Sequence, residues 1–307
     1  MSISPHRTVA RMERSEAAPG LRFAPSGYGW LGQALVDAVT AGAALRIGAR
    51  RYSVRVEMCR RASSGAPIYV QERRAQSWWE PMTISRYYDK AALEAQVQAG
   101  RHREAVGGLW DEIGQLQIDF LVSQGLVPHH RLLDIGCGSL RGGVKLIRYL
   151  DAGHYAGVDL HESLINAGYE IELAKAGLTH KLPRSNLVAE GEFDFSWCPM
   201  RVDFALAQSV FTALPLNFLR ICLERLGNFV VRDGKFFVSI FEVPDHHPTW
   251  TPYRHPSGYI SYGAKEPYHY RFADMEFCCR GLPWRAIHIG AWGHPLSVRM
   301  VRFDKTS

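Results

Sequence analysis

The chain has 307 residues, of which 47% are hydrophobic and 21% are charged. This composition excludes a disordered or fibrous protein, and no apolar run approaches the roughly 18 residues that a membrane-spanning helix needs. The net charge of +6 is concentrated in residues 1–75, which hold 12 arginines and five acidic residues, whereas residues 76–307 hold 24 basic and 25 acidic residues.

The N-terminal quarter of the sequence lacks the patterns of a large core. Residues 1–28 are rich in Arg, Ser, Pro and Gly and predict a flexible arm. Residues 29–80 predict a small accessory lobe with a helix over 30–45 and a hairpin of strands 50–58 and 68–71. The basic charge is compatible with a polyanion-binding arm, but the pattern favours a solvated basic face. Because the N-terminus also lacks the apolar core of a signal peptide, we expect a cytoplasmic protein.

Residues 81–307 predict a single larger domain. Two helices are expected first, over 91–99 and 109–124, and strands then alternate with helices. The expected strands are 131–135, 155–160, 186–189, 202–207 and 235–241, and the expected helices are 140–150, 163–176 and 216–229. This alternation is typical of an α/β fold with a mostly parallel, helix-covered sheet, and strands 284–289 and 298–303 predict an antiparallel hairpin at its end.

A glycine-rich turn follows the first strand of this domain. Gly136, Gly138 and Gly142 lie in the run 133–143 between a strand and a helix, where missing Cβ atoms allow a ligand to approach backbone N–H groups. Asp159 ends the next strand, where its carboxylate can accept hydrogen bonds from two adjacent ribose hydroxyls. The combination predicts a site for a nucleoside-containing cofactor.

Two details favour S-adenosylmethionine over a nicotinamide or flavin cofactor. The spacing of the three glycines misses the dinucleotide pattern GxGxxG by one residue. Asp134, two residues before the first glycine, suits a ligand ammonium but would repel a pyrophosphate. S-adenosylmethionine carries an ammonium and a sulfonium and no phosphate.

These motifs resemble those of the class I S-adenosylmethionine-dependent methyltransferases. The similarity extends from about residue 87 to 241 together with the terminal hairpin, and it is greatest for a bacterial subgroup that methylates small molecules and glycans, on the runs 106–114 and 134–143. The resemblance implies a Rossmann-like, seven-stranded sheet with the cofactor across the carboxyl ends of the strands.

The resemblance also implies roles for individual residues, carried over by position. Asp134, Gly136 and Gly138 would line the methionine end of the cofactor, and Asp159 with Leu160 would bind the ribose. Glu192 or Phe193 would lie near the adenine, and Gln208 with Ser209 would face the sulfonium and the acceptor. Two further candidates have equally plausible structural roles: Arg141, which could pair with the cofactor carboxylate, and Trp110, which could flank the cofactor.

The segment after the fourth strand excludes some acceptors. Enzymes that methylate exocyclic base nitrogens carry an Asn/Asp-Pro-Pro-aromatic sequence there, and residues 208–211 read Gln-Ser-Val-Phe. The order Cys198-Pro199 is the reverse of the Pro-Cys of cytosine C5 enzymes. Nucleic acid is therefore not the expected partner, except through the basic N-terminal lobe.

Residues 242–271 are rich in His, Tyr and Pro and predict a lid over an acceptor pocket. Methyl transfer requires alignment of the nucleophile and, for many acceptors, removal of its proton. His269, His247 and Glu242 are the candidate bases, in that order. For any single one of them, the role of an ordinary hydrogen-bonded loop residue is favoured over that of a base. A metal on the run 245–247 is disfavoured, because adjacent histidines cannot share one helical face at ligand spacing, and no metal is expected.

The sequence thus predicts a methyltransferase that acts on a hydroxyl of a small molecule or glycan, in secondary metabolism or polysaccharide biosynthesis. N- or C-methylation of a small metabolite is the alternative within enzymes. A non-catalytic cofactor-binding or nucleic-acid-binding module that uses the basic lobe is the alternative outside them. A homo-oligomer is compatible with this interpretation, and no membrane association is expected.

Overall fold

The computed structural model describes residues 44–50, 53–59 and 84–306. The chain divides into two units, residues 1–82 and 83–307, which we describe separately. The predicted arm over 1–28 and residues 30–43 of the predicted helix 30–45 lie outside the described residues. The last two residues of that predicted helix begin a strand instead.

The first unit contains one antiparallel hairpin. Its strands are β1 (Ala44–Arg50) and β2 (Ser53–Cys59), paired from Ala44 opposite Cys59 to Arg50 opposite Ser53. The predicted strand 50–58 corresponds to β2, with a start three residues later. Its partner is β1, which comes before it in the sequence. Residues 68–71, the predicted partner, lie outside the described residues.

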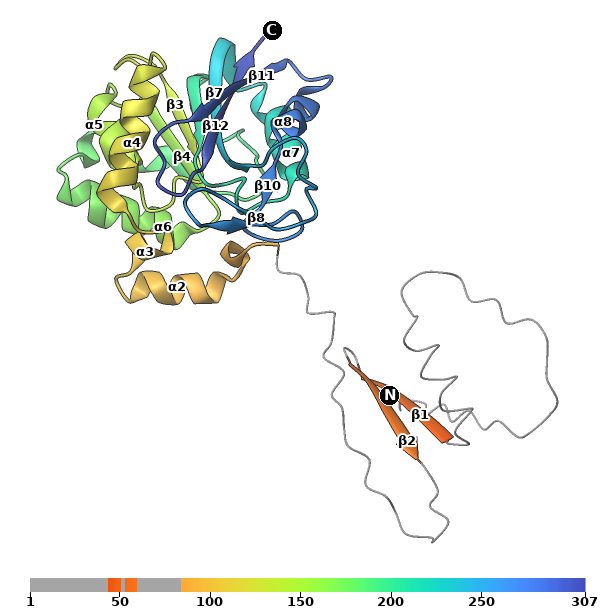
Figure 1. Ribbon diagram of the computed structural model, residues 1–307. Helices are drawn as coiled ribbons and strands as arrows, with labels where there is room; N and C mark the ends of the chain where they lie inside the picture. Colours follow the sequence, from red (N-terminus) through yellow and green to blue (C-terminus); the bar gives the residue numbers. More distant parts are fainter. Residues whose placement is uncertain (1–43, 51–52, 60–83, 307) are drawn as a thin grey trace. The chain divides into compact units, whose positions relative to one another are not determined.

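The second unit contains the predicted mixed sheet, which confirms the expected fold class (Figure 1). Its path is β11-β12-β7-β6-β3-β4-β5, and short β10 pairs with β7 as an eighth strand where seven were expected. The five strands from β7 to β5 along this path run parallel, whereas β12 is antiparallel to both β7 and β11. Their bounds are β3 (Leu132–Ile135), β4 (Tyr155–Asp159), β5 (Leu187–Ala189), β6 (Val202–Ala207), β7 (Val230–Glu242), β10 (His269–Tyr270), β11 (Trp284–Ala291) and β12 (Arg299–Lys305).

Helices cover both faces of this sheet because its central strands are apolar on both faces. In β3, Leu132 belongs to the core shared with α4 and α5, and Leu133 to the core shared with α7 and α8 (Figure 1). The helices are α2 (Lys90–Gln98), α3 (His102–Ala105), α4 (Trp110–Ser123), α5 (Gly143–Tyr149), α6 (Glu162–Asn166), which continues as the π-helical η2 (Ala167–Leu173), α7 (Leu216–Leu226) and α8 (Phe272–Cys279). Helix α8 was not predicted.

The remaining elements are short. Single 3-10 turns are η1 (Arg86–Tyr88), η3 (Thr179–Lys181) and η4 (Arg184–Asn186), and β8 (Tyr253–Arg254) pairs with β9 (Ile260–Ser261) within the predicted lid. No helix in the described ranges has both the length and the apolar character needed to cross a membrane.

Candidate functional site

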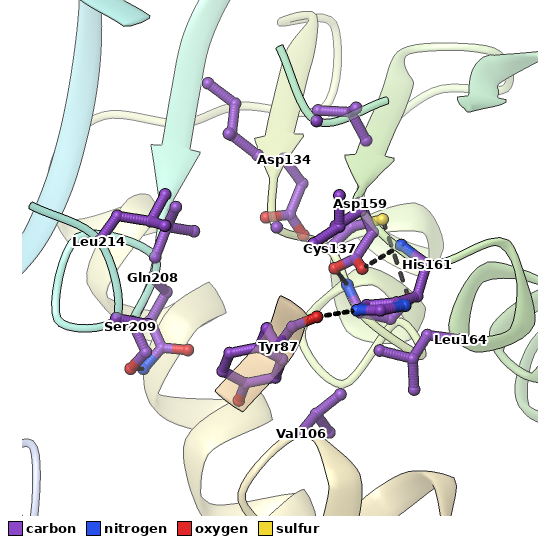
Figure 2. A pocket seen from close by; sticks show the side chains of 18 of the residues that line it. Tyr87, Val106, Asp134, Cys137, Asp159, His161, Leu164, Gln208, Ser209 and Leu214 are labelled. Carbon is purple, nitrogen blue, oxygen red and sulfur yellow. Dashed lines mark hydrogen bonds between the residues drawn. The ribbon is translucent and has the colours of Figure 1, made fainter. Parts of the chain in front are cut away.

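A cavity opens at the carboxyl ends of β3, β4, β5 and β6, the edge at which ligands bind open α/β sheets (Figure 2). Figure 2 shows Asp134 and Asp159 at the ends of neighbouring strands, with Gln208 and Ser209 on another side of the cavity. The lining residues come from seven segments of the chain and are Ser85, Tyr87, Tyr88, Val106, Gln117, Asp134, Ile135, Gly136, Cys137, Gly138, Arg141, Gly142, Val158, Asp159, Leu160, His161, Leu164, Glu190, Gly191, Phe193, Gln208, Ser209, Val210, Ala213 and Leu214.

The glycine-rich turn after β3 forms the floor of this cavity. Gly136 and Gly138 have φ values of 74° and 53°, in the left-handed region that favours glycine. A Cβ on Gly136 would lie 2.4 Å from Cγ2 of Val210, and one on Gly138 would lie 2.7 Å from Cγ1 of Val106. Only glycine allows the turn to approach these neighbours, so the motif is sterically required.

Asp159 fixes the turn as well as facing the cavity. Its Oδ2 accepts the Gly138 N–H at 2.9 Å, and its Oδ1 accepts the His161 N–H at 3.0 Å. Burial raises the pKa of Asp159, while these two N–H groups counter the shift. Each carboxylate oxygen keeps a second lone pair that a ligand hydroxyl can use.

Asp134 is a buried carboxyl at the end of β3 and is only 5% exposed. Its Oδ2 accepts the phenolic O–H of Tyr155 at 2.7 Å. Burial raises the pKa of Asp134 to about 7, against the opposing effect of that hydrogen bond. A ligand cation would favour the ionised form, so this carboxyl is suited to an ammonium group.

Arg141 forms hydrogen bonds to two segments that line or adjoin the cavity. Its Nη1 donates to the carbonyl oxygens of Val106 and Gly108, both at 2.9 Å, and its Nη2 donates to Oε1 of Gln208 at 2.9 Å. The same Gln208 oxygen accepts from Nε2 of buried Gln117 at 2.9 Å. Arg141 thus joins the loop before α4 to the end of β6.

Residues 84–88, which we call the strap, come before the first α-helix of this unit and contribute Ser85, Tyr87 and Tyr88 to the cavity lining. Oγ of Ser85 donates to Oε2 of Glu266 at 2.9 Å, and the His161 ring lies 2.6 Å from the carbonyl oxygen of Tyr87 (Figure 2). Sequence reasoning did not identify the strap, His161 or Gln117. The only sequence signal was the position of His161 directly after the strand that ends in Asp159.

The remaining predicted cofactor residues divide into two groups. Leu160 and Phe193 line the cavity together with the residues already described. Glu192 is exposed and does not line it, whereas Glu190, two residues earlier, does. Trp110 also lies outside the lining, and its ring packs 4.7 Å from the guanidinium of Arg103.

The first candidate base, His269, lies in a buried hydrogen-bonded chain inside the lid and does not line the cavity. Its Nε2 donates to the Thr249 carbonyl at 2.9 Å, which leaves Nδ1 to accept from Ser261 Oγ at 2.9 Å. His255 Nε2 then donates to the same hydroxyl oxygen at 2.7 Å. Acceptance at Nδ1 requires a neutral His269 ring, and both ring nitrogens of His269 are engaged inside the lid, so this arrangement indicates a structural role.

The other two candidate bases also lie outside the cavity lining. The His247 ring packs edge-on against His269 with centroids 5.7 Å apart, and its Nε2 lies 3.1 Å from Oγ1 of Thr251. Glu242 ends β7 and contacts Nε2 of His288 through both oxygens, at 2.8 and 3.0 Å. The lid candidates are therefore brought near one another, but not to the cavity wall.

We expect the lid to lose stability as the pH falls. Burial, with a contribution from His269, lowers the pKa of His255 to about 4, so the folded lid resists protonation that the unfolded chain accepts near pH 6.5. The stabilisation is complete above pH 6.5 and declines as the pH falls toward 4. Hydrogen exchange of residues 249–269 measures this loss, and a Ser261→Ala variant, which removes the shared hydroxyl, should show it already at neutral pH.

No group of three or more His, Cys, Asp or Glu side chains in the part of the chain that the structure describes is arranged to hold a metal ion.

Comparison with known proteins supports the fold. No family model matches the chain. A protein of Nostoc punctiforme PCC 73102, provisionally named an O-methyltransferase, has 13% identity and a TM-score of 0.50, with 71% of this chain and 61% of that chain covered. Magnesium protoporphyrin IX methyltransferase from Synechocystis PCC 6803, with bound S-adenosylhomocysteine, has 12% identity and a TM-score of 0.49, with 71% and 100% covered. A methyltransferase from Clostridium acetobutylicum ATCC 824 has 11% identity and a TM-score of 0.48, with 72% and 99% covered.

The second unit therefore has the Rossmann-like fold that the sequence motifs predicted, a mostly parallel sheet flanked by helices, and this fold is similar to that of the Nostoc punctiforme structure. The glycine turn and the two strand-end carboxyl groups occupy one cavity on this fold.

Proposed function

We propose that this chain is an S-adenosylmethionine-dependent methyltransferase that methylates a hydroxyl of a small molecule or glycan in a biosynthetic pathway. The supporting observation is the pair Asp134 and Asp159, which end adjacent parallel strands and face one cavity. The Asp134 carboxyl suits an ammonium group, and the Asp159 carboxyl suits two adjacent ribose hydroxyls. Neither carboxyl suits a pyrophosphate, because both are acidic.

The residues of the cavity fit this cofactor along its length. Asp134 would hold the ammonium, Asp159 and Leu160 the ribose, and Phe193 with Glu190 the adenine. The cofactor would supply an electrophilic methyl group on a sulfonium. The chain's own residues would orient the acceptor from the Gln208 and Ser209 end and exclude water beneath the strap.

Calorimetry with S-adenosylmethionine, S-adenosylhomocysteine and NAD tests this proposal. We expect the first two to bind and NAD not to bind, because the cavity presents carboxyl groups where NAD carries its pyrophosphate. Methyl transfer from labelled S-adenosylmethionine to a panel of hydroxyl and amine acceptors then tests the atom that is methylated. Preferential NAD binding would sink the proposal.

Binding of S-adenosylhomocysteine should weaken as the pH falls through 7. The ligand ammonium pairs with ionised Asp134, whose pKa is about 7 in the free protein, so protons compete with the ligand below that pH. We expect a decline approaching tenfold per pH unit below pH 6, measured by calorimetry from pH 5.5 to 8. Asp134→Asn should bind weakly and without this pH dependence, and an equal slope in both proteins contradicts the assignment.

Methyl transfer to a nitrogen or carbon atom of an acceptor in this panel would support the alternative of N- or C-methylation. The alternative of a non-catalytic module depends on the basic residues 1–75, most of which lie outside the described residues. Salt-sensitive polyanion binding that is lost on deletion of residues 1–75, with turnover intact, would assign that segment a separate role.

A further inference from the structure

Two side-chain nitrogen atoms face each other at the end of β6. Nε2 of Gln208 and Nε2 of His294 lie 3.4 Å apart. His294 belongs to the loop between β11 and β12, which antiparallel pairing of β12 with β7 brings to the carboxyl edge of the sheet. Neither His294 nor this loop was a site candidate from the sequence.

The orientation of the Gln208 amide is determined by its neighbours. Its Oε1 accepts from Arg141 and from Gln117, each at 2.9 Å. A guanidinium only donates hydrogen bonds, so the atom facing Arg141 must be the amide oxygen. The amide nitrogen of Gln208, with its two hydrogens, therefore points toward Oγ of Ser209, at 2.6 Å, and toward His294.

The tautomer of His294 follows from its own loop. Its Nδ1 accepts the backbone N–H of Leu296 at 3.2 Å. Burial, reinforced by Arg141, lowers the pKa of His294 to about 4, so the ring is neutral at pH 7. A neutral imidazole that accepts at Nδ1 carries its hydrogen on Nε2. Nε2 of His294 is therefore a donor.

One hydrogen of the Gln208 amide nitrogen is donated to Oγ of Ser209. Its second hydrogen and the Nε2–H of His294 point toward each other, and among residues 84–306 the structure forms no hydrogen bond from either of them to an acceptor. A single ligand oxygen can accept from both, as in an oxyanion hole. The Arg141 guanidinium, which bonds to the same Gln208, makes a negatively charged oxygen the favoured partner.

We propose that His294 and Gln208 bind a carboxylate oxygen of the methyl acceptor. This inference rests on the proposed function, since it identifies the class of acceptor. Donors withdraw electron density from the oxygen that they bind, so this carboxylate positions the acceptor while a separate hydroxyl of the same molecule receives the methyl group. The acceptor class is therefore a hydroxy acid, and His294 is a positioning residue.

Binding of benzoate and of benzyl alcohol, which differ in the carboxylate, tests the assignment. Both are titrated by NMR into the protein saturated with S-adenosylhomocysteine and into the free protein. We expect the wild type to prefer benzoate, and His294→Phe to lose roughly tenfold or more of the benzoate affinity, because a hydrogen bond to a charged group is lost. Affinity for benzyl alcohol and for S-adenosylhomocysteine should not change, which excludes a general structural effect.

His130→Phe is a matched control. His130 is also half-buried, its Nδ1 accepts a backbone N–H at 3.2 Å, and it packs on an aromatic ring, that of Phe204, as His294 packs on Trp292. His130 lies beside Phe204 within β6, whereas His294 lies beside Gln208, just beyond the carboxyl end of that strand. We expect this variant to bind benzoate as the wild type does.

Two results would overturn the inference. One is equal benzoate affinity in the wild type and His294→Phe. The other is a loss of S-adenosylhomocysteine affinity in His294→Phe while affinity for 5′-methylthioadenosine, which lacks the amino-acid end, is retained, because the donors would then hold the cofactor's own carboxylate. Failure of S-adenosylhomocysteine to bind the wild type contradicts the proposed function instead, and the titrations of the free protein still test the benzoate site.

Discussion

Asp159→Ala should reduce the affinity for S-adenosylhomocysteine by roughly 100-fold or more. The carboxylate would accept hydrogen bonds from the ribose, each contributing about 1.5–3 kcal/mol. It also holds the backbone N–H groups of Gly138 and His161, so its loss disturbs the turn on which the ligand rests. Calorimetry at pH 7.5 measures the change.

The control for this substitution is Asp203→Ala. Asp203 is also half-buried and its Oδ2 accepts the backbone N–H of Arg131 at 2.8 Å, but it lies at the opposite end of the parallel strands. We expect this variant to bind the ligand normally. Asp159→Asn, which can still accept one N–H, separates loss of charge from disruption of the turn. Unchanged affinity in both Asp159 variants would contradict the ribose role.

Gly136→Ala should strongly destabilise the protein and abolish ligand binding. The new Cβ would lie 2.4 Å from Cγ2 of Val210, and the φ of 74° disfavours alanine. We expect a loss of about 3 kcal/mol or more in the free energy of unfolding, of which roughly 1–2 kcal/mol is the backbone cost. Urea denaturation monitored by fluorescence measures it.

Two further variants separate the two contributions. Gly258 has a φ of 82° with nothing within 4 Å of its would-be Cβ, so Gly258→Ala should show the backbone cost alone. Gly136→Ala combined with Val210→Ala removes the clashing methyl groups and should recover part of the stability. If Gly136→Ala cost no more than Gly258→Ala, close packing at the turn would not be the reason for the glycine.

The elements with strong local patterns were predictable. The alternation of apolar strands with amphipathic helices predicted β3, β4, β6 and α4 to within a few residues, because the patterns of these segments reflect burial on known faces. Helix α8 escaped prediction because Phe272–Cys279 is short and carries apolar residues on several faces. Strand β1 was not predicted, because the helical spacing of apolar residues was extended to residue 45 and the first strand was expected to begin only at residue 50.

The positions of the lid side chains depended on the tertiary structure. Its histidines suggested bases, yet His255, Ser261 and His269 hydrogen-bond to one another inside the lid. The sequence shows which side chains can exchange protons, but their neighbours decide whether a ligand can reach them. Conversely, His294 was not a candidate, because it lies in a loop near the end of the sequence. Pairing of β12 with β7 brings it beside Gln208.

The sequence by itself determined the class of fold and predicted most of the residues that line the strand-end cavity around the glycine turn. Asp134 and the glycine turn are contiguous in the chain, and Asp159 ends the strand that pairs next to theirs, so the alternation of strands and helices was enough to predict that they lie together. The Gln208 end of the cavity depended on the tertiary structure, because its lining residues come from the strap, α4 and the end of β6, and His294 of the last hairpin lies beside Gln208. Pairing and packing over more than 200 residues, rather than any local pattern, bring those four segments together.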